Sequence, residues 1–146
     1  MSDKIESIDE ILEFAIAREI EAYQLYMYLS QWVDNPEISR ICEEFASEEL
    51  EHKSKLELEL MKRGEVVANF DIQMKTAIME KAVNMDYKEL LAFAMEKEQT
   101  SIDLYTQLAN ITADKESRET LLAIIEEEAH HKKRFEEEYN TVYKKK

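Results

Sequence analysis

The sequence predicts an all-α protein, in which four long helices form a bundle. The chain has 146 residues but contains one glycine and one proline, whereas β-rich and α/β folds of this length need many more turn residues. Hydrophobic residues make up 45% of the chain and charged residues 36%, a mixture that is typical of amphipathic helices with one face in water. The length is that of one ordinary domain, so we expect a single domain over residues 1–146.

Four helices are expected, at about residues 8–33, 36–63, 87–111 and 115–142. The first begins after Ser7, which can form a capping box with Glu10 because each side chain accepts a hydrogen bond from the other residue's backbone N–H. Apolar residues then recur every three or four positions up to Val33. The first helix therefore has one face for a core.

The second helix is expected to begin at Pro36, because Asn35 is a good N-cap and proline suits the first helical position. It ends at Gly64, since glycine readily adopts the left-handed conformation that closes many helices. Residues 65–85 form a long connection, with a short helix expected at about residues 72–83. A connection of this length can cross a bundle from one helix pair to the next.

The third helix starts after Asp86, which can form a second capping box with Glu89. A short turn at Thr112-Ala113-Asp114 then leads into the fourth helix. Because short turns make consecutive helices antiparallel neighbours, we expect two antiparallel hairpins joined by a long crossover.

Net charge and cysteine content exclude several classes of protein. The formal net charge of −14 at pH 7 disfavours nucleic acid and anionic membranes as partners. The single cysteine, Cys42, excludes an internal disulfide and any zinc or rubredoxin-type site built from cysteines. The N-terminus has no apolar run typical of a signal peptide, and no segment has the length of a membrane span. We therefore expect a cytoplasmic protein.

The two predicted hairpins are copies of one repeat, offset by 79 residues. A purely architectural repeat would not need to keep acidic residues and histidines at matching positions. This repeat keeps three such pairs, which are Glu19 with Glu98, Glu49 with Glu128, and His52 with His131.

Each of these six residues interrupts an apolar stripe, so each is expected to face the core. Glu19, for example, lies four residues after Ala15 and seven before Tyr26, on the same helical face. The midpoint between Glu19 and Glu49 falls in the first turn, and the equivalent midpoint of the second hairpin falls in the second turn. Both hairpins thus bring two glutamates to the same depth. Buried carboxylates are costly unless cations lie between them, which predicts a pair of metal ions.

The spacing Glu-x-x-His occurs on the second helix of each hairpin and places a carboxylate and an imidazole one turn apart. Such a pair suits a metal ion that takes the imidazole nitrogen while the carboxylate bridges to a second ion. In the second hairpin Glu127 and His130 form a rival register with the same spacing. The repeat offset, and Phe135 four residues after His131, favour Glu128 and His131. His130 is then expected at the surface or beside a ligand.

This pattern resembles the ferritin-like superfamily of di-iron carboxylate proteins, and most closely its rubrerythrin-like branch, over all four helices. The resemblance implies a ferritin-like four-helix bundle with two iron ions, for which manganese or zinc could substitute. It implies that Glu49 and Glu128 bridge the ions, and that the other glutamate and the histidine of each hairpin complete one ion. The implied ligands are Glu19, Glu49, His52, Glu98, Glu128 and His131.

The resemblance also implies an oxidoreductase that reduces hydrogen peroxide or dioxygen. Rubrerythrins carry a rubredoxin domain with two cysteine pairs, which this chain lacks, so electrons would come from an external donor such as a rubredoxin-like protein or a flavoprotein. Rubrerythrins also tend to have a further glutamate one turn after the third-helix ligand, where this chain has Ser101. The sequence therefore departs from the rubrerythrin route of peroxide reduction at that position.

Two other functions stay open at the level of sequence. A ferritin-type role in iron binding or storage, without catalytic turnover, predicts a large hollow assembly. A metal-free helical interaction module predicts that chelators leave the melting temperature unchanged. For the oxidoreductase we expect a homodimer, because bundles with a hairpin repeat often dimerise.

Three tyrosines, Tyr23, Tyr26 and Tyr105, are candidates for positions near the metal ions. Tyr26 and Tyr105 are related by the repeat, and each follows a predicted ligand by seven residues. Either could donate a hydrogen bond to a ligand, although a core tyrosine with another partner is the commoner outcome.

Overall fold

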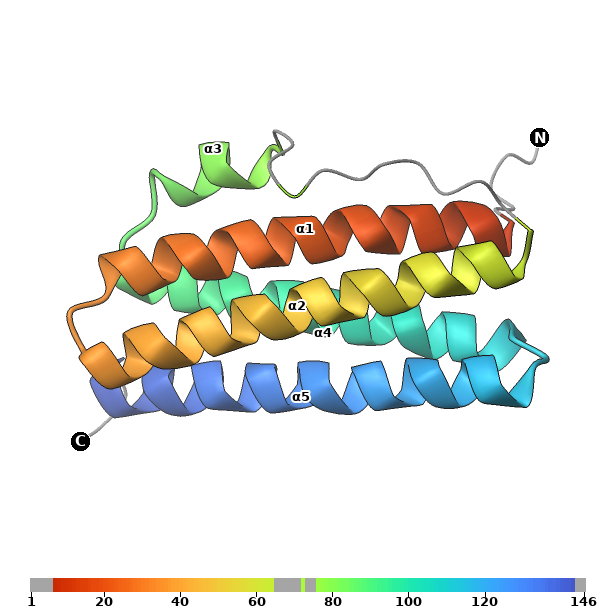
Figure 1. Ribbon diagram of the computed structural model, residues 1–146. Helices are drawn as coiled ribbons and strands as arrows, with labels where there is room; N and C mark the ends of the chain where they lie inside the picture. Colours follow the sequence, from red (N-terminus) through yellow and green to blue (C-terminus); the bar gives the residue numbers. More distant parts are fainter. Residues whose placement is uncertain (1–6, 65–71, 73–75, 144–146) are drawn as a thin grey trace, which may run out of the picture.

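The computed structural model describes residues 7–64, 72 and 76–143, and the regular secondary structure within them is entirely helical. The four long helices lie along one another, and one short helix lies outside them (Figure 1). The predicted all-α class is confirmed. The helices are α1 (Ile8–Trp32), α2 (Pro36–Lys62), α3 (Ile78–Ala82), α4 (Tyr87–Ile111) and α5 (Lys115–Tyr143).

Local sequence signals determine where the long helices begin. The predicted capping box after Ser7 is present, because the Ser7 hydroxyl accepts from the backbone of Glu10, whose side chain accepts from the backbone of Ser7. The Asp86 box of α4 is formed in the same way. The Asn35 side chain caps α2, and Gly64 after its end has φ +85°, the left-handed conformation that favours glycine.

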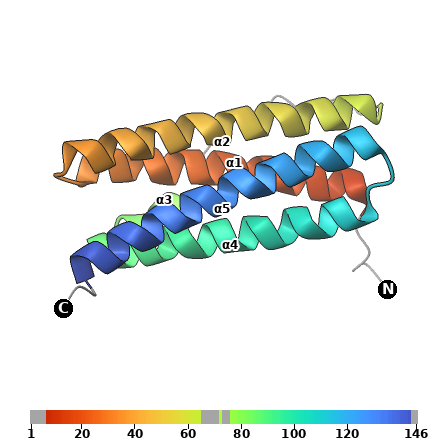
Figure 2. The ribbon, with the colours of Figure 1, turned by 90° about the horizontal axis from the view of Figure 1, so that it is seen from below.

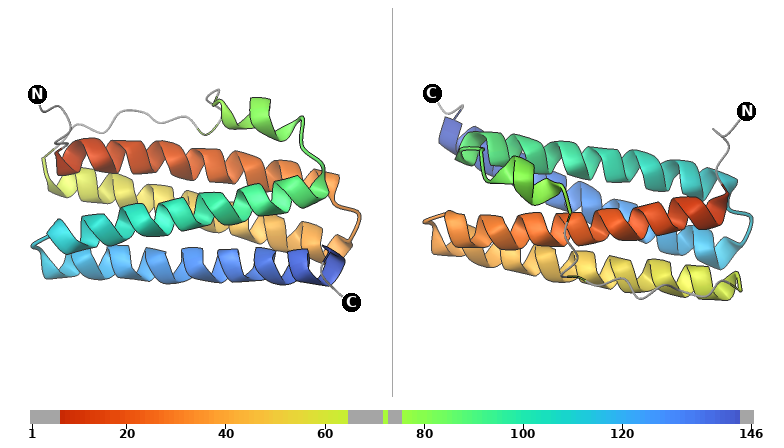
Figure 3. Two further views of the ribbon diagram at one scale, coloured as in Figure 1. Left: turned by 180° about the vertical axis from the view of Figure 1, so that it is seen from behind. Right: turned by 90° about the horizontal axis from the view of Figure 1, so that it is seen from above.

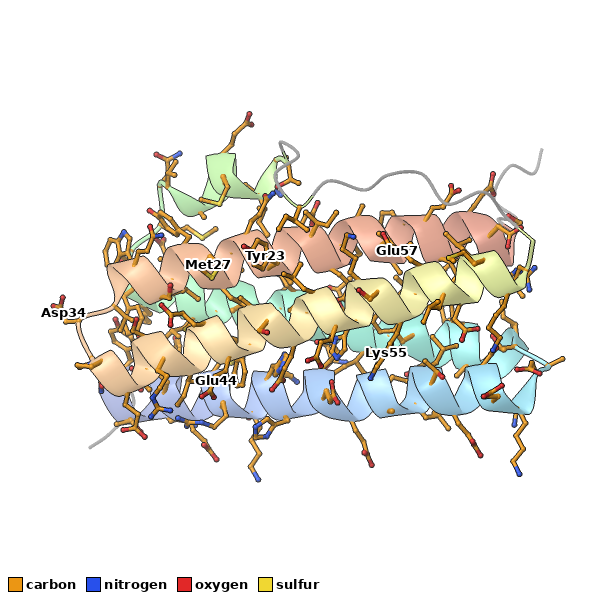
Figure 4. The ribbon with its side chains drawn as sticks, in the orientation of Figure 1. Tyr23, Met27, Asp34, Glu44, Lys55 and Glu57 are labelled. Atoms are coloured by element: carbon orange, nitrogen blue, oxygen red, sulfur yellow. The ribbon has the colours of Figure 1, made fainter. Side chains whose placement is uncertain are left out.

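The long helices form two antiparallel hairpins, α1 with α2 and α4 with α5. Across the bundle α1 packs on α4, and α2 packs on α5 (Figure 2). Exposed charged side chains such as that of Glu44 lie on the outer side of α2 (Figure 4). None of the helices in the described ranges is both long and apolar enough to cross a bilayer.

The described part of the crossover lies along the outside of α1, where α3 packs (Figure 3). Gln24 of α1 holds the crossover against this helix through two hydrogen bonds. The Gln24 side-chain amide donates to the carbonyl of Ile72 at 3.0 Å and accepts from the Thr76 hydroxyl at 2.8 Å. The short helix expected at 72–83 is observed only over Ile78–Ala82, with Ile72 in a turn, and residues 73–75 lie outside the described residues.

The apolar core is divided into two clusters along the bundle. The first holds the C-terminal half of α1 and the N-terminal half of α2, including Leu25 and Phe45. The second holds the opposite ends of these helices, including Leu12 and Leu56. Between them along each long helix lie buried charged residues, and these form the candidate site.

Candidate metal centre

The structure brings all six predicted site residues together in the middle of the bundle. Each of the six is at most 1% exposed. One comes from α1, two from α2, one from α4 and two from α5, and they are Glu19, Glu49, His52, Glu98, Glu128 and His131. The two apolar clusters close the site at both ends and keep bulk water away from it.

The ligand atoms form two overlapping groups, within each of which all atoms lie within 4.8 Å of one another. Glu49 and Glu128 belong to both groups, so they occupy the shared middle of the site. The first group is completed by Glu19 and His52, and the second by Glu98 and His131. This arrangement has the two-fold character of the sequence repeat.

Both histidines turn their Nδ1 atoms toward the carboxylates. His52 Nδ1 lies 3.0 Å from Glu49 Oε1 and 3.6 Å from Glu19 Oε1. His131 Nδ1 lies 3.1 Å from Glu98 Oε2 and 3.4 Å from the nearest oxygen of Glu128. The Nδ1 atoms are therefore the nitrogens available to metal ions in the centre.

The Nε2 atoms point the other way, to two carboxylates at the edge of the site. His52 Nε2 lies 2.5 Å from Glu127 Oε1, and His131 Nε2 lies 2.6 Å from Glu48 Oε1. The side chains of Glu48 and Glu127 are about two-fifths exposed, at 40% and 43%. A histidine that donates from Nε2 to such a carboxylate is fixed in the tautomer that leaves Nδ1 free for a metal.

Two tyrosines fix the terminal carboxylates of α1 and α4, Glu19 and Glu98. The Tyr26 hydroxyl donates to Glu98 Oε2, and the Tyr105 hydroxyl donates to Glu19 Oε2. Burial and the neighbouring carboxylates raise the pKa of both phenols, so both keep their protons and act as donors. Tyr23 lies elsewhere, on the α3 side of α1, where it lines a groove with Met27 (Figure 4).

Without a metal, protons offset the negative charge of the site. Burial raises the pKa of Glu49 well above its usual value, and the same cause raises that of Glu128 to about 8. Burial alone would lower the pKa of His131, but the hydrogen bonds that its imidazole donates to Glu128, Glu48 and Glu98 outweigh burial and raise the pKa to about 11. The pKa of His52 is raised in the same way. The site thus favours positive charge at its centre.

The donor set also has unused capacity for a cation. Among the described residues, three buried carboxylate oxygens have no hydrogen-bond partner, namely Glu19 Oε1, Glu49 Oε2 and Glu128 Oε1. The three glutamates that carry these oxygens all belong to the overlapping groups. Buried carboxylate oxygens without a partner lower the free energy of unfolding unless they coordinate a metal ion or bind a proton. The residues present therefore fit a site for two metal ions with oxygen-rich ligation and one imidazole for each ion.

The structure separates the two registers on α5. His131 is buried among the carboxylates, whereas His130 is exposed and its ring lies 5.9 Å from that of Phe45. Glu127, the partner of His130 in the rival register, instead contacts His52. The sequence pattern indicated no role for Glu48, and for Glu127 it indicated only the rival register with His130. The signal was nevertheless present, because these two glutamates obey the 79-residue offset and each precedes a central glutamate.

Comparisons with known proteins agree with this geometry. No curated protein sequence matches the chain. Among solved structures, the bacterioferritin of Desulfovibrio desulfuricans, which has a diiron site, matches with a TM-score of 0.78 and 20% identity over 92% of this chain and 79% of that one. At this identity the likeness shows the shared ferritin-like fold. The family model for rubrerythrin matches residues 10–139, so the chain belongs to the rubrerythrin family of ferritin-like di-iron proteins.

Proposed function

We propose that this protein holds two iron ions in the buried glutamate and histidine site and works as an oxidoreductase that reduces hydrogen peroxide or dioxygen. The observation that carries the proposal is the pair of overlapping ligand groups, each with three carboxylates and one imidazole. A structural role alone would not explain four buried glutamates, three of which have an oxygen without a hydrogen-bond partner. Family membership supports iron as the metal.

Each half of the site has a defined task in this proposal. Glu49 and Glu128, which belong to both ligand groups, would bridge the ions. Glu19 and His52 would complete one ion, and their counterparts Glu98 and His131 would complete the other. Manganese would suit the same donors, and zinc could occupy them as a substitute.

The chemistry of the bound metal would be electron transfer. Two ferrous ions supply two electrons, which with two protons convert one hydrogen peroxide molecule to two water molecules. The protein would hold the ions, exclude bulk water with its two apolar clusters, and keep one oxygen of Glu19 and one of Glu98 fixed through the tyrosine hydroxyls. The other oxygen of Glu19, Oε1, has no hydrogen-bond partner and would be available to a metal ion.

We propose that the electrons come from a separate donor. The single cysteine, Cys42, is buried and cannot form a rubredoxin-type site, so we propose an external donor, either a rubredoxin-like protein or a flavoprotein. We also propose a cytoplasmic location, because a reducing compartment would keep the iron in its ferrous state. We further propose a homodimer, because bundles with a hairpin repeat often dimerise.

The test is metal analysis followed by reaction with an oxidant. We expect protein loaded with ferrous iron under anaerobic conditions to hold two ions per chain. Addition of peroxide should consume about one peroxide per chain and produce the visible absorption of a ferric centre, which a reductant should then remove. A chain that binds no iron, and whose melting temperature a chelator leaves unchanged, would contradict the proposal and favour a metal-free interaction module.

Iron storage is the second candidate, and the fold shared with a bacterioferritin supports it. Ser101 also occupies the position of the further glutamate that rubrerythrins tend to carry, which leaves a symmetric set of six ligands. Storage requires a large hollow assembly and the accumulation of far more than two ions per chain. Size-exclusion chromatography separates the candidates, because a dimer has no cavity in which to store mineral.

A further inference from the structure

The two halves of the metal centre have the same types of ligand, but different apolar residues pack against those ligands. In the half completed by Glu98 and His131, hereafter the Glu98/His131 half-site, the ring of Phe45 stacks on the imidazole of His131. The ring centroids lie 4.0 Å apart and the planes meet at 27°. The repeat places Ile124 at the position equivalent to Phe45, so the other half has an aliphatic residue there.

The stacked phenylalanine belongs to a larger aromatic cluster. Phe135 lies 5.5 Å from Phe45 and 5.1 Å from Tyr26 between ring centroids. Tyr26 presents its edge to His131 at 6.3 Å and donates its hydroxyl hydrogen bond to Glu98. One cluster therefore contacts both the histidine and the terminal carboxylate of the Glu98/His131 half-site.

The half completed by Glu19 and His52, hereafter the Glu19/His52 half-site, has no such cluster among the described residues. The ring contact found there for His52 is with His131 itself, at 6.3 Å. In this half, the repeat positions equivalent to Phe135 and Phe45 are occupied by Leu56 and Ile124. Both aliphatic residues are fully buried. Only Tyr105 is retained, and it holds Glu19.

The contacts that hold the ligands from outside the ligand set are otherwise matched between the two halves. Each histidine contacts one outer glutamate through Nε2, and each terminal glutamate accepts from one tyrosine. Among the residues that surround the ligands, the aromatic cluster of Phe45, Phe135 and Tyr26 is therefore the main difference between the halves. A flat ring stacked at van der Waals distance restricts rotation of the imidazole about its χ2 angle, so less rotational freedom remains to be lost when a metal binds to Nδ1.

We propose that the Glu98/His131 half-site binds its metal ion first and more tightly than the Glu19/His52 half-site, with Phe45 as the positioning residue that sets this order. The inference rests on the metal centre proposed above, and it adds an order of occupation that the symmetric ligand set does not contain. Support from outside the coordination shell typically changes metal affinity by about 10- to 100-fold, so we expect the two affinities to differ by about tenfold.

The test is a titration of the metal-free, full-length protein with Co²⁺, followed by visible absorption and by calorimetry. We expect two binding steps of one ion each. His52→Ala should keep the tighter step, and His131→Ala should remove it. Two ions that bind in one step with equal affinity, or loss of the tighter step in His52→Ala instead, would overturn the proposed order. No Co²⁺ binding in either half would contradict the metal centre itself, so the two failures are distinguishable.

An exchange of Phe45 and its repeat equivalent, Ile124, tests the role of Phe45. We expect Phe45→Ile to weaken the tighter step about tenfold and to leave the weaker one unchanged, while Ile124→Phe should strengthen the weaker step. The double variant Phe45→Ile/Ile124→Phe conserves the total core volume and should reverse the order of filling. Circular dichroism and urea denaturation check that each variant is folded. If the order of filling in the folded double variant is that of the wild type, Phe45 does not determine it.

Discussion

His52 Nε2 lies 2.5 Å from Glu127 Oε1, and this contact joins α2 of the first hairpin to α5 of the second. The repeat produces the reciprocal contact between His131 and Glu48, at 2.6 Å. Each histidine is therefore oriented by the hairpin to which it does not belong. Because both ligand groups also draw carboxylates from both hairpins, neither half of the chain contains a complete site.

The outer glutamates should control metal affinity without touching the metal. We expect Glu127→Ala and Glu48→Ala each to weaken binding of one metal ion by about 10- to 100-fold, because the imidazole loses the partner that fixes its tautomer. Competition with a chromophoric chelator would measure the change. Glu126→Ala, at an exposed position of the same helix, is the matched control. Equal affinities for Glu127→Ala and Glu126→Ala would show that the contact has no part in metal binding.

Removing a central carboxylate should stabilise the metal-free protein while it abolishes tight metal binding. Burial and the charges of Glu128, Glu19 and Glu98 raise the pKa of Glu49, so keeping this group in the core costs free energy when no metal is present. We expect Glu49→Gln to raise the free energy of unfolding in the presence of a chelator by roughly 1–3 kcal/mol. Urea denaturation would measure it.

The matched control for this change is Glu51→Gln, which lies on the same helix but is exposed. Substitution at such a surface position should change the free energy of unfolding by less than about 0.5 kcal/mol. The two variants should also differ with metal, since iron should raise the melting temperature of Glu51→Gln and of the wild type but not that of Glu49→Gln. A destabilised metal-free Glu49→Gln would show that the carboxylate has a structural role.

The helices and their ends could be predicted from the sequence because their causes are local. The capping boxes at Ser7 and Asp86 each involve residues three positions apart, and both are formed as predicted. The crossover helix was expected to begin near Ile72, but in the described residues α3 spans only Ile78–Ala82. Its position depends on packing against α1, a long-range contact that no local pattern encodes.

The inner residues of the site could be found from the sequence because each breaks an apolar stripe and the repeat marks it twice. The repeat also relates Glu48 to Glu127, but it did not single them out, since both lie on half-exposed faces where glutamate is common. Their role appears only when α2 and α5 are placed side by side. The stacking of Phe45 on His131 was hidden for the same reason, because it joins different hairpins.

The tyrosine hydroxyls should contribute to stability through the buried carboxylates that they contact. In Tyr105→Phe, Glu19 Oε2 loses its donor inside the core, and we expect the free energy of unfolding to fall by about 1–3 kcal/mol. Tyr26→Phe should behave alike through Glu98. Tyr23→Phe, on the α3 side of α1, is the control and should have a smaller effect. Urea denaturation would compare the three, and equal losses would contradict a specific role for the two hydroxyls.

The single thiol should be inert in the folded protein. Cys42 is 1% exposed, and burial together with the charges of Glu138 and Glu43 raises its pKa to about 12. The reactive thiolate is therefore a very small fraction at pH 8, and reagents cannot reach the sulfur. We expect iodoacetamide to leave the native protein unmodified at pH 8, as measured by mass spectrometry, and to modify it fully in guanidinium chloride.

Because a raised pKa delays thiolate formation until strongly alkaline pH, labelling of the native protein should stay slow up to pH 9. Rapid native labelling would show that α2 opens near Cys42, and this part of the core would then be less stable than its burial indicates.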